Sequence, residues 1–371
     1  MKIFAFYLPQ FHSIPENDVW WGNNFTEWTN VKKSTPLFYN HNQPRIPLNQ
    51  NYYNLLNTET LRWQADLLKK YKLDGLCFYH YWFNGKLLLE KPAELLLKEK
   101  SIEMPFFFSW ANEPWTRSWD GKNKDILIDQ NYGDESDWIK HFNYILPFFK
   151  DKRYLKHNGF PVFVIYRSAN FERCQDWINC WRSLAADNCL GNIHFVSTLT
   201  SFEKDNRNIN FDAEINFEPL NTLIHHMNIY AKKSFFPRIG RSINKRISKL
   251  IYSFKNQDNF FQVPNFDYDL TWKTILNKKF NYKSYAGGFV DWDNTPRKQD
   301  KGLVALNGNP HKFKQYFDKL YLKARDDNSP YIFINAWNEW AEGTYLEPDT
   351  KNEYKYLEAI KDVVEKNQQS S

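Results

Sequence analysis

The sequence predicts a single (β/α)8 barrel, and three of its features point to this fold class. Eight short apolar or aromatic segments recur along the 371 residues, and amphipathic stretches of helical length separate most of them. Continuous apolar segments are typical of parallel strands buried on both faces, and their alternation with helices is typical of βα units. Eight repeats favour a closed barrel over an open sheet, and no G-x-G-x-x-G motif follows any segment.

We expect the eight strands, in chain order, at Ile3–Leu8, Gly75–Trp82, Pro105–Trp110, Val162–Tyr166, Ile193–Thr198, Ala213–Phe217, Gly287–Trp292 and Tyr331–Trp337. The clearest helical patterns between them are Glu59–Tyr71, Ser136–Phe149 and Phe171–Ala186. A length of 371 residues suits one barrel with insertions, so we treat residues 1–371 as a single catalytic domain with loop insertions on its carboxyl-terminal face.

Polar and aromatic residues gather directly after four of these strands. They form PQFH after the first, HYWFNG after the second, ANEPWTRSWDG after the third and NEWAEGTYLEP after the last. In a barrel, the carboxyl ends of all strands meet at one face, where active sites lie. Aromatic residues make up 18% of the chain, and aromatic rings stack on the apolar faces of sugars. An aromatic core is the alternative, but these positions favour a carbohydrate site that includes Trp21, Trp82, Trp110, Trp115 and Trp340.

The net charge of +6 is concentrated in one segment between the sixth and seventh strands, residues 231–259. This segment holds eight Lys or Arg and one acid, so the remainder of the chain is close to neutral and nucleic-acid binding is not predicted. Its apolar residues follow helical spacing. The segment is therefore either an ordinary barrel helix or an amphipathic helix that contacts an anionic membrane surface.

The four cysteines predict neither a metal site nor a redox motif, because none forms a C-x-x-C pair and no histidine spacing accompanies them. We expect no metal and no cofactor. The first residues, MKIFAFYLPQFHSIP, are too short an apolar run and too polar for a signal peptide or membrane span. We expect a cytoplasmic location, with peripheral contact at the inner face of the membrane if the basic segment binds lipid.

Two glutamates after the last strand are the candidate catalytic pair. Glu339 and Glu342 are three residues apart, so an extended strand would send them to opposite faces. A turn after Glu339, made easy by Gly343, would place both on one side, as a retaining glycosidase requires. Two close carboxylates also separate their pKa values, which leaves one protonated. A solvated acidic loop is the alternative, but the flanking Trp337 and Trp340 disfavour it.

Other polar residues at strand ends are candidates for substrate binding. Glu113 either binds sugar hydroxyls, forms an ion pair with Arg117, or acts as an acid or base, and we favour binding. Carboxylates accept two hydroxyl bonds each, which suits a sugar. The D-x-D pattern at Asp291 and Asp293 occurs often by chance, so we do not interpret it as a metal site. The remaining candidates are His12, His80, Asn112, Glu214, Glu218, Arg297 and Asn338.

Five motifs resemble the WbsX-like family of surface-polysaccharide glycosyltransferases, which is structurally related to glycoside hydrolase family 99. They are FYLPQFH, ENDVWWGNNFTEWTNV, CFYHYWFNGK, FSWANEPWTRSWDG and NAWNEWAEGTYLEPD, and the similarity extends from Ile3 to about Leu357. Family 99 enzymes are (β/α)8 barrels that act on α-mannosidic linkages with retention. The motifs after the first and second strands differ from those of the hydrolases, so the resemblance does not carry the mannose preference.

The resemblance implies a role for each catalytic candidate. Glu339 would deprotonate the 2-hydroxyl, which attacks the anomeric carbon and gives a 1,2-anhydro sugar, and Glu342 would protonate the leaving group and later activate the acceptor. Three functions stay open: a glycosyltransferase or transglycosylase of O-antigen or capsule synthesis, an endo-acting α-mannoside hydrolase, and a non-catalytic glycan-binding protein. The expected partner is an oligosaccharide or a lipid-linked glycan.

Overall fold

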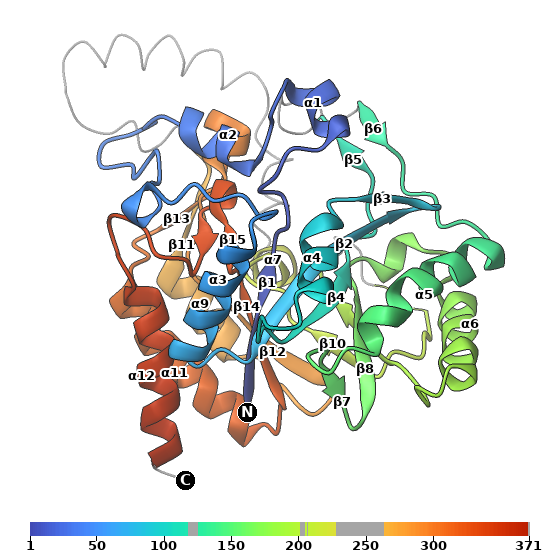
Figure 1. The fold of residues 1–371 in the computed structure, drawn as a ribbon. Coiled ribbons are helices and arrows are strands. Elements are labelled where there is room, and N and C mark those ends of the chain that lie inside the picture. Colours follow the sequence, from blue (N-terminus) through green and yellow to red (C-terminus); the bar gives the residue numbers. More distant parts are fainter. Residues whose placement is uncertain (118–124, 201–204, 206, 228–262, 370–371) are drawn as a thin grey trace, which may run out of the picture.

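The computed structural model describes residues 1–117, 125–200, 205, 207–227 and 263–369, and these contain a closed barrel of eight parallel strands (Figure 1). In barrel order the strands are β1 (Lys2–Tyr7), β2 (Gly75–Phe83), β4 (Phe106–Trp110), β8 (Phe160–Ile165), β9 (His194–Thr198), β10 (Ala213–Ile215), β12 (Ser284–Phe289) and β14 (Tyr331–Asn335). The last strand pairs in parallel with the first, which closes the barrel and confirms the predicted fold class.

All eight predicted strands overlap the observed ones, and the seventh is displaced by three residues. We expected Gly287–Trp292, whereas β12 spans Ser284–Phe289. The polar Ser284 falls outside the apolar run, yet it pairs with Glu214 of β10. The residues from Asp291 onward belong instead to the loop at the barrel mouth, where their carboxylates bind basic partners.

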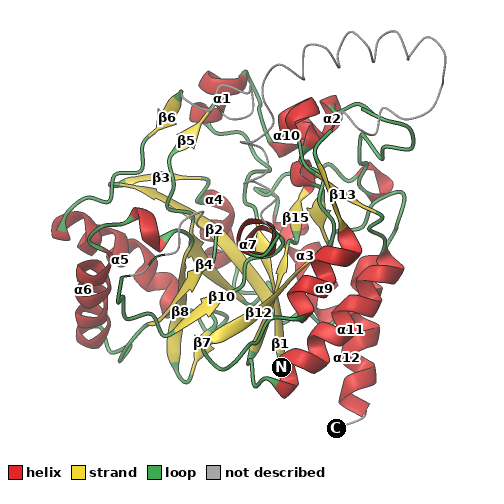
Figure 2. Cartoon of the chain, turned by 180° about the vertical axis from the view of Figure 1, so that it is seen from behind, coloured by secondary structure: helices red, strands yellow, loops and turns green. Residues whose placement is uncertain are grey.

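Helices surround the barrel and connect its strands (Figure 2). They are α3 (Thr58–Lys70), α4 (Lys91–Lys98), α5 (Glu135–Phe149), α6 (Cys174–Asp187), α7 (Leu220–His225), α9 (Tyr268–Leu276), α11 (Pro310–Asp326) and α12 (Lys355–Gln369). The three helical stretches predicted from the sequence correspond to α3, α5 and α6. The basic segment 231–259 lies outside the described residues.

The barrel interior is filled by aromatic side chains rather than by the branched aliphatic residues common in this fold. Phe4 and Phe6 of β1 contact Phe107 and Phe333 from other strands, with ring centroids 5.1–5.8 Å apart. A second aromatic layer lies between strands and helices, where Trp177, Trp181 and Trp272 are fully buried. Much of the aromatic content therefore packs the core.

Most of the short elements cluster at the carboxyl ends of the strands, opposite the N-terminus, whereas β7 (Lys156–His157) pairs with the start of β8 on the amino-terminal side (Figure 1). The connection from β1 to α3 contributes α1 (Pro15–Trp21), α2 (Glu27–Lys33) and η1 (Leu48–Gln50). The other short elements are β3 (Lys86–Leu88), β5 (Trp115–Thr116), β6 (Ile126–Ile128), β7 (Lys156–His157), η3 (Ser168–Asn170), β11 (Asn265–Asp267), α10 (Thr295–Lys298), η6 (Gln299–Lys301), β13 (Val304–Leu306), β15 (Asn338–Glu339), η7 (Trp340–Glu342) and β16 (Thr344–Tyr345). Across the described ranges, no helix has the length and apolar character needed to cross a bilayer.

Candidate active site

The chain turns sharply after β14, as the spacing of the two glutamates predicts. β15 carries Glu339, η7 ends at Glu342, and β16 returns antiparallel to β15. Gly343 closes the turn in the left-handed region at φ 64°, and a Cβ atom there would come within 2.8 Å of Asp293. Glycine is therefore required both by the backbone conformation and by the space available. The turn places Glu339 and Glu342 on the same side of the chain.

Arg297 joins the two glutamates and a third acid through its guanidinium group. Its Nη2 donates to Glu339 Oε2 at 2.9 Å and to Glu27 Oε1 at 2.7 Å, and its Nη1 donates to Glu342 Oε1 at 2.6 Å. Glu27 Oε1 also accepts the backbone N–H of Ala341 at 3.0 Å. Three carboxyl groups thus share one cation, so the cluster favours retaining a proton over full ionisation.

The environment of Glu339 favours its protonated form. Burial raises the pKa of Glu339 to about 8, the negative charges of Glu342 and Glu27 act in the same direction, and Arg297 opposes them. Burial also raises the pKa of Glu27, again against Arg297. The exposed fraction of the side chain increases from 0% at Glu27 to 8% at Glu339 and 24% at Glu342. Glu342 is therefore the carboxylate most accessible to a ligand.

Three tyrosines lie close to this cluster and were not identified from the sequence. Negative charge on Glu339 adds to the burial that raises the pKa values of Tyr79, Tyr81 and Tyr166. Tyr79 stacks on Phe6 of the barrel interior and contacts Tyr166 edge-on. No hydrogen bond links their hydroxyls to any residue that the structure describes. These hydroxyls can bond to a polar ligand.

The opposite wall of the mouth follows β4. Glu113 forms an ion pair with Arg167 at 2.9 Å, whereas the alternative raised from the sequence was a pairing with Arg117. The Arg117 guanidinium lies instead over the ring of Trp21, 5.6 Å from its centroid. Trp115 is half-buried and contacts Tyr81 edge-on at 5.2 Å, and the nearby Trp20 at 5.8 Å. The expected Glu113, Trp115, Trp21 and Arg117 therefore form a polar and aromatic rim.

Asp291 and Asp293 support the catalytic turn from below. Arg45 donates to Asp291 at 2.9 Å and to the carbonyl of Gly343 at 3.0 Å. Asp293 accepts from His41 and Gln43, at 2.8 and 2.7 Å. Burial would raise the pKa of Asp293, but the His41 bond and the Arg45 charge lower it to about 2. Their carboxylates bind protein groups, whereas we had expected them to bind sugar.

A second buried carboxylate holds the tryptophans that flank Glu339. Glu347 accepts from the indoles of Trp337 and Trp340 at 2.8 and 2.7 Å, and from Gln64 and Tyr53 at 2.8 Å each. These bonds lower its pKa, but burial is stronger and raises the pKa to about 7. Asn338 is equally engaged, because its amide bonds to the backbone of Leu8 at the end of β1. Trp340 and Asn338 thus hold the turn in place.

Three residues expected at the mouth face the outer helices instead. His80 contacts His141 of α5 at 2.8 Å, and Trp82 stacks on the same histidine while its indole N–H donates to Asp137. Trp110 is buried against Trp177 of α6. The strand alternates its side chains between two faces, so His80 and Trp82 point away from the face that carries Tyr79 and Tyr81.

The remaining candidates form no hydrogen bond or ion pair with Glu27, Glu339 or Glu342. Glu218 is buried in an ion pair with Lys278 at 2.5 Å. Glu214 is exposed on the face of β10 opposite the buried Ala213 and Ile215. Asn112 is buried, and its amide bonds to the backbone of Arg167 at 2.7 and 2.8 Å. His12 is buried, which lowers its pKa to about 4. Of the whole predicted set, the structure brings Glu339, Glu342 and Arg297 into direct contact.

A (β/α)8 barrel with converging carboxyl groups, an arginine and tyrosine hydroxyls at its mouth is the architecture of a carbohydrate-active enzyme. The chain belongs to the WbsX glycosyltransferase family, whose model matches residues 3–360. Within the described residues, no group of three or more His, Cys, Asp or Glu is arranged to hold a metal ion.

Two curated sequence relatives carry the name WxcX. The chain is 36% identical over 365 residues to the uncharacterised protein WxcX of Xanthomonas campestris pv. campestris strain B100, and equally to its counterpart in strain ATCC 33913. The match covers 97% of this chain and 49% of either relative, so the chain spans about half the length of the curated relatives it matches.

Solved structures show the same fold at low sequence identity. The glycoside hydrolase family 99 endo-α-mannosidase from Bacteroides thetaiotaomicron aligns with a TM-score of 0.56 and 16% identity, over 99% of this chain and 98% of the enzyme. A glycoside hydrolase-like protein aligns with the same TM-score and 14% identity, over 98% and 93% of the two chains.

The network around Glu347 generates a prediction about stability. We expect Glu347→Gln to lower the free energy of unfolding by about 2–4 kcal/mol, because the amide nitrogen would face hydrogen-bond donors in a buried site. Urea unfolding measures this loss, with Glu365→Gln on the exposed face of α12 as the matched control. A Glu347→Gln variant as stable as the wild type would show that the four donors do not depend on the carboxylate.

Proposed function

We propose that this protein forms or remodels glycosidic bonds in the synthesis of cell-surface polysaccharide, by a retaining mechanism that uses Glu339 and Glu342. The observation that carries the proposal is the convergence of both carboxyl groups on Arg297 at the barrel mouth. Retaining chemistry needs two carboxyl groups close together, one acting on the sugar and one on the departing oxygen. Membership of a glycosyltransferase family supports the same assignment.

In the proposed reaction, each glutamate accepts one proton and donates one proton over the full cycle. Glu339 takes the proton of the substrate 2-hydroxyl, whose oxygen attacks the anomeric carbon and forms a 1,2-anhydro sugar. The bond from that carbon to the leaving oxygen breaks, and Glu342 protonates this oxygen. Glu342 then takes a proton from the acceptor hydroxyl, which attacks the same carbon and opens the ring. Glu339 returns its proton to the 2-oxygen, and two inversions at one carbon give retention.

The neighbouring groups have supporting roles in this proposal. Arg297 holds the carboxyl groups in position and lowers the pKa of Glu339 against the effect of burial, while Tyr79, Tyr81 and Tyr166 bond to sugar hydroxyls. Glu113 and Trp115 contact the part of the glycan chain that lies at the rim of the barrel mouth. The substrate is an oligosaccharide or lipid-linked glycan, and the enzyme works in the cytoplasm.

A second candidate is an endo-acting hydrolase of α-mannosides, which the fold similarity to an endo-α-mannosidase favours. Both candidates share the first half-reaction and differ in the acceptor, which is a sugar hydroxyl in one and water in the other. Incubation with labelled α-mannosyl oligosaccharides and with nucleotide-sugar donors, followed by mass spectrometry, separates transfer products from hydrolysis products. Hydrolysis alone would favour the second candidate.

The catalytic pair can be tested by isosteric substitution. We expect Glu339→Gln and Glu342→Gln each to lower turnover about 10²–10⁴-fold, because each removes one proton-transfer group. Melting temperatures should stay close to the wild type, and Glu214→Gln, which alters an exposed carboxyl group on β10, should keep full turnover. Full turnover in either catalytic variant would remove that residue from the mechanism. A non-catalytic glycan-binding protein would show no turnover in the wild type.

The raised pKa of Glu339 predicts the pH dependence of the rate. A general base acts only when deprotonated, so kcat/KM should rise with pH through about 8, the pKa of Glu339. Arg297 lowers this pKa, so Arg297→Gln should move the rise to higher pH in addition to lowering the rate. Initial rates from pH 5 to 10 measure both effects. A rate that falls through this range would make Glu339 the acid instead.

A further inference from the structure

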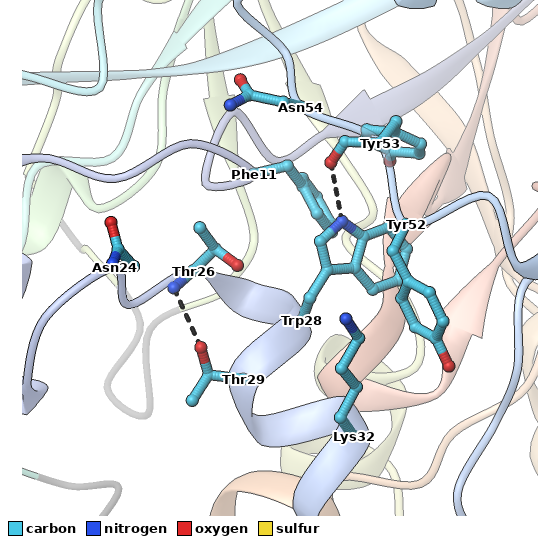
Figure 3. A pocket seen from close by; sticks show the side chains of 9 residues that line it. All are labelled: Phe11, Asn24, Thr26, Trp28, Thr29, Lys32, Tyr52, Tyr53 and Asn54. Carbon is cyan, nitrogen blue, oxygen red and sulfur yellow. Dashed lines mark hydrogen bonds between the residues drawn. The ribbon is translucent and has the colours of Figure 1, made fainter.

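Two surface cavities share one lining residue, Tyr52, and Figure 3 shows the residues that line the first of them. The first has a volume of about 260 Å³ and the second about 480 Å³, and Tyr52 lines both. The second volume lies within the range of sites for small ligands, and the first lies just below it. We call the two cavities together the Tyr52 strip. Neither is lined by Glu339, Glu342 or Arg297.

The floor of the first cavity is aromatic and rigid. Trp28 is buried, and its indole N–H donates to the carbonyl of Tyr53 at 2.9 Å (Figure 3). Its ring meets Tyr52 edge-on at 5.2 Å and Phe11 at 4.7 Å. Tyr52 itself is half-buried, and the amine of Lys32 lies 4.0 Å from its ring centroid. An aromatic ring that its neighbours hold in position at the surface can stack on an apolar face of a ligand.

The walls carry amides and hydroxyls rather than charges. Asn24, Thr26, Thr29 and Asn54 line the first cavity, and Asn49, Gln50 and Asn51 line the second. The side chain of Asn24 makes no hydrogen bond to the described part of the chain. Trp63 and Tyr354 add two half-buried rings to the second cavity. Aromatic rings between neutral donors and acceptors match a ligand that alternates apolar faces with hydroxyl groups.

We propose that the Tyr52 strip binds a neutral or acidic stretch of the glycan chain whose end occupies the barrel mouth. No carboxylate is among the described residues that line it, so it holds a glycan chain without cleaving it and does not favour a basic sugar. Among those same described residues Lys32 is the one cation, which is too little charge for a nucleic-acid backbone. This inference rests on the proposed function for the identity of the ligand.

The position of the strip connects it to the catalytic cluster. Glu27, which binds Arg297, and Trp28, the floor of the strip, are consecutive residues of α2. The ring of Trp28 also contacts Trp340 of the catalytic turn, with centroids 5.3 Å apart. A glycan chain that leaves the barrel mouth across α2 would therefore reach Tyr52 on the other side of this helix. Binding there is equal for substrate and transition state, so it lowers KM and leaves kcat unchanged.

Tyr52→Ala tests this inference against an array of neutral and acidic oligosaccharides of two to eight units. We expect about ten-fold weaker binding of chains of four or more units and unchanged binding of disaccharides. Tyr52→Phe keeps the ring and should bind as the wild type does. Tyr282→Ala removes an exposed tyrosine before β12 that is not among the residues lining either cavity, and it is the control. Melting temperatures confirm that each variant folds.

Two results would overturn the inference: long chains that bind Tyr52→Ala as tightly as the wild type, or an array on which the wild type binds no chain. The Glu339→Gln variant distinguishes this failure from failure of the proposed function. Loss of turnover in Glu339→Gln together with normal binding by Tyr52→Ala would support the proposed function and overturn the binding role of the Tyr52 strip. Full turnover in Glu339→Gln together with weakened binding by Tyr52→Ala would overturn the proposed role of Glu339 and support the binding role of the Tyr52 strip.

Discussion

The guanidinium group of Arg297 is the contact on which the arrangement of the mouth depends. It joins three segments that are distant in sequence: α2 through Glu27, α10 through its own backbone, and the turn after β14 through Glu339 and Glu342. Without a cation among them, three neighbouring carboxyl groups would repel one another and could not stay ionised in a buried site. The same group therefore sets both the geometry of the site and its proton content.

The turn that carries Glu339 and Glu342 is fixed by two further networks. Arg45 binds the Gly343 carbonyl and Asp291, which holds the turn from one side. Glu347 binds the indoles of Trp337 and Trp340, which hold it from the other side. Side chains whose neighbours are locked in this way lose little entropy on binding a ligand, and their reacting groups stay within the narrow geometry that catalysis needs.

The sequence was sufficient to predict the barrel, its strands and the turn that carries Glu339 and Glu342, because these depend on local patterns and on residue spacing. It assigned His80 and Trp82 to the mouth and overlooked Tyr79 and Tyr81, although the alternation of side chains along β2 distinguishes the two sets. A strand buried on both faces hides this alternation, since both faces are apolar or aromatic. The position of Glu27 could not be predicted from the sequence, because this residue belongs to a short helix within a long connection. No periodicity in the sequence places that helix over the last strand.

The exposure of the three carboxyl groups indicates which contacts of Arg297 can change when a substrate enters. The Glu27 contact is fully removed from water, so breaking it would leave a buried charge without a partner. The Glu342 contact is partly hydrated, and a solvated ion pair contributes little to stability. Arg297 can therefore remain anchored on Glu27 while Glu342 exchanges its arginine contact for a sugar oxygen. In the proposed mechanism, such an exchange would leave Glu342 free to donate a proton, with Glu339 still held at the position where the 2-hydroxyl would arrive.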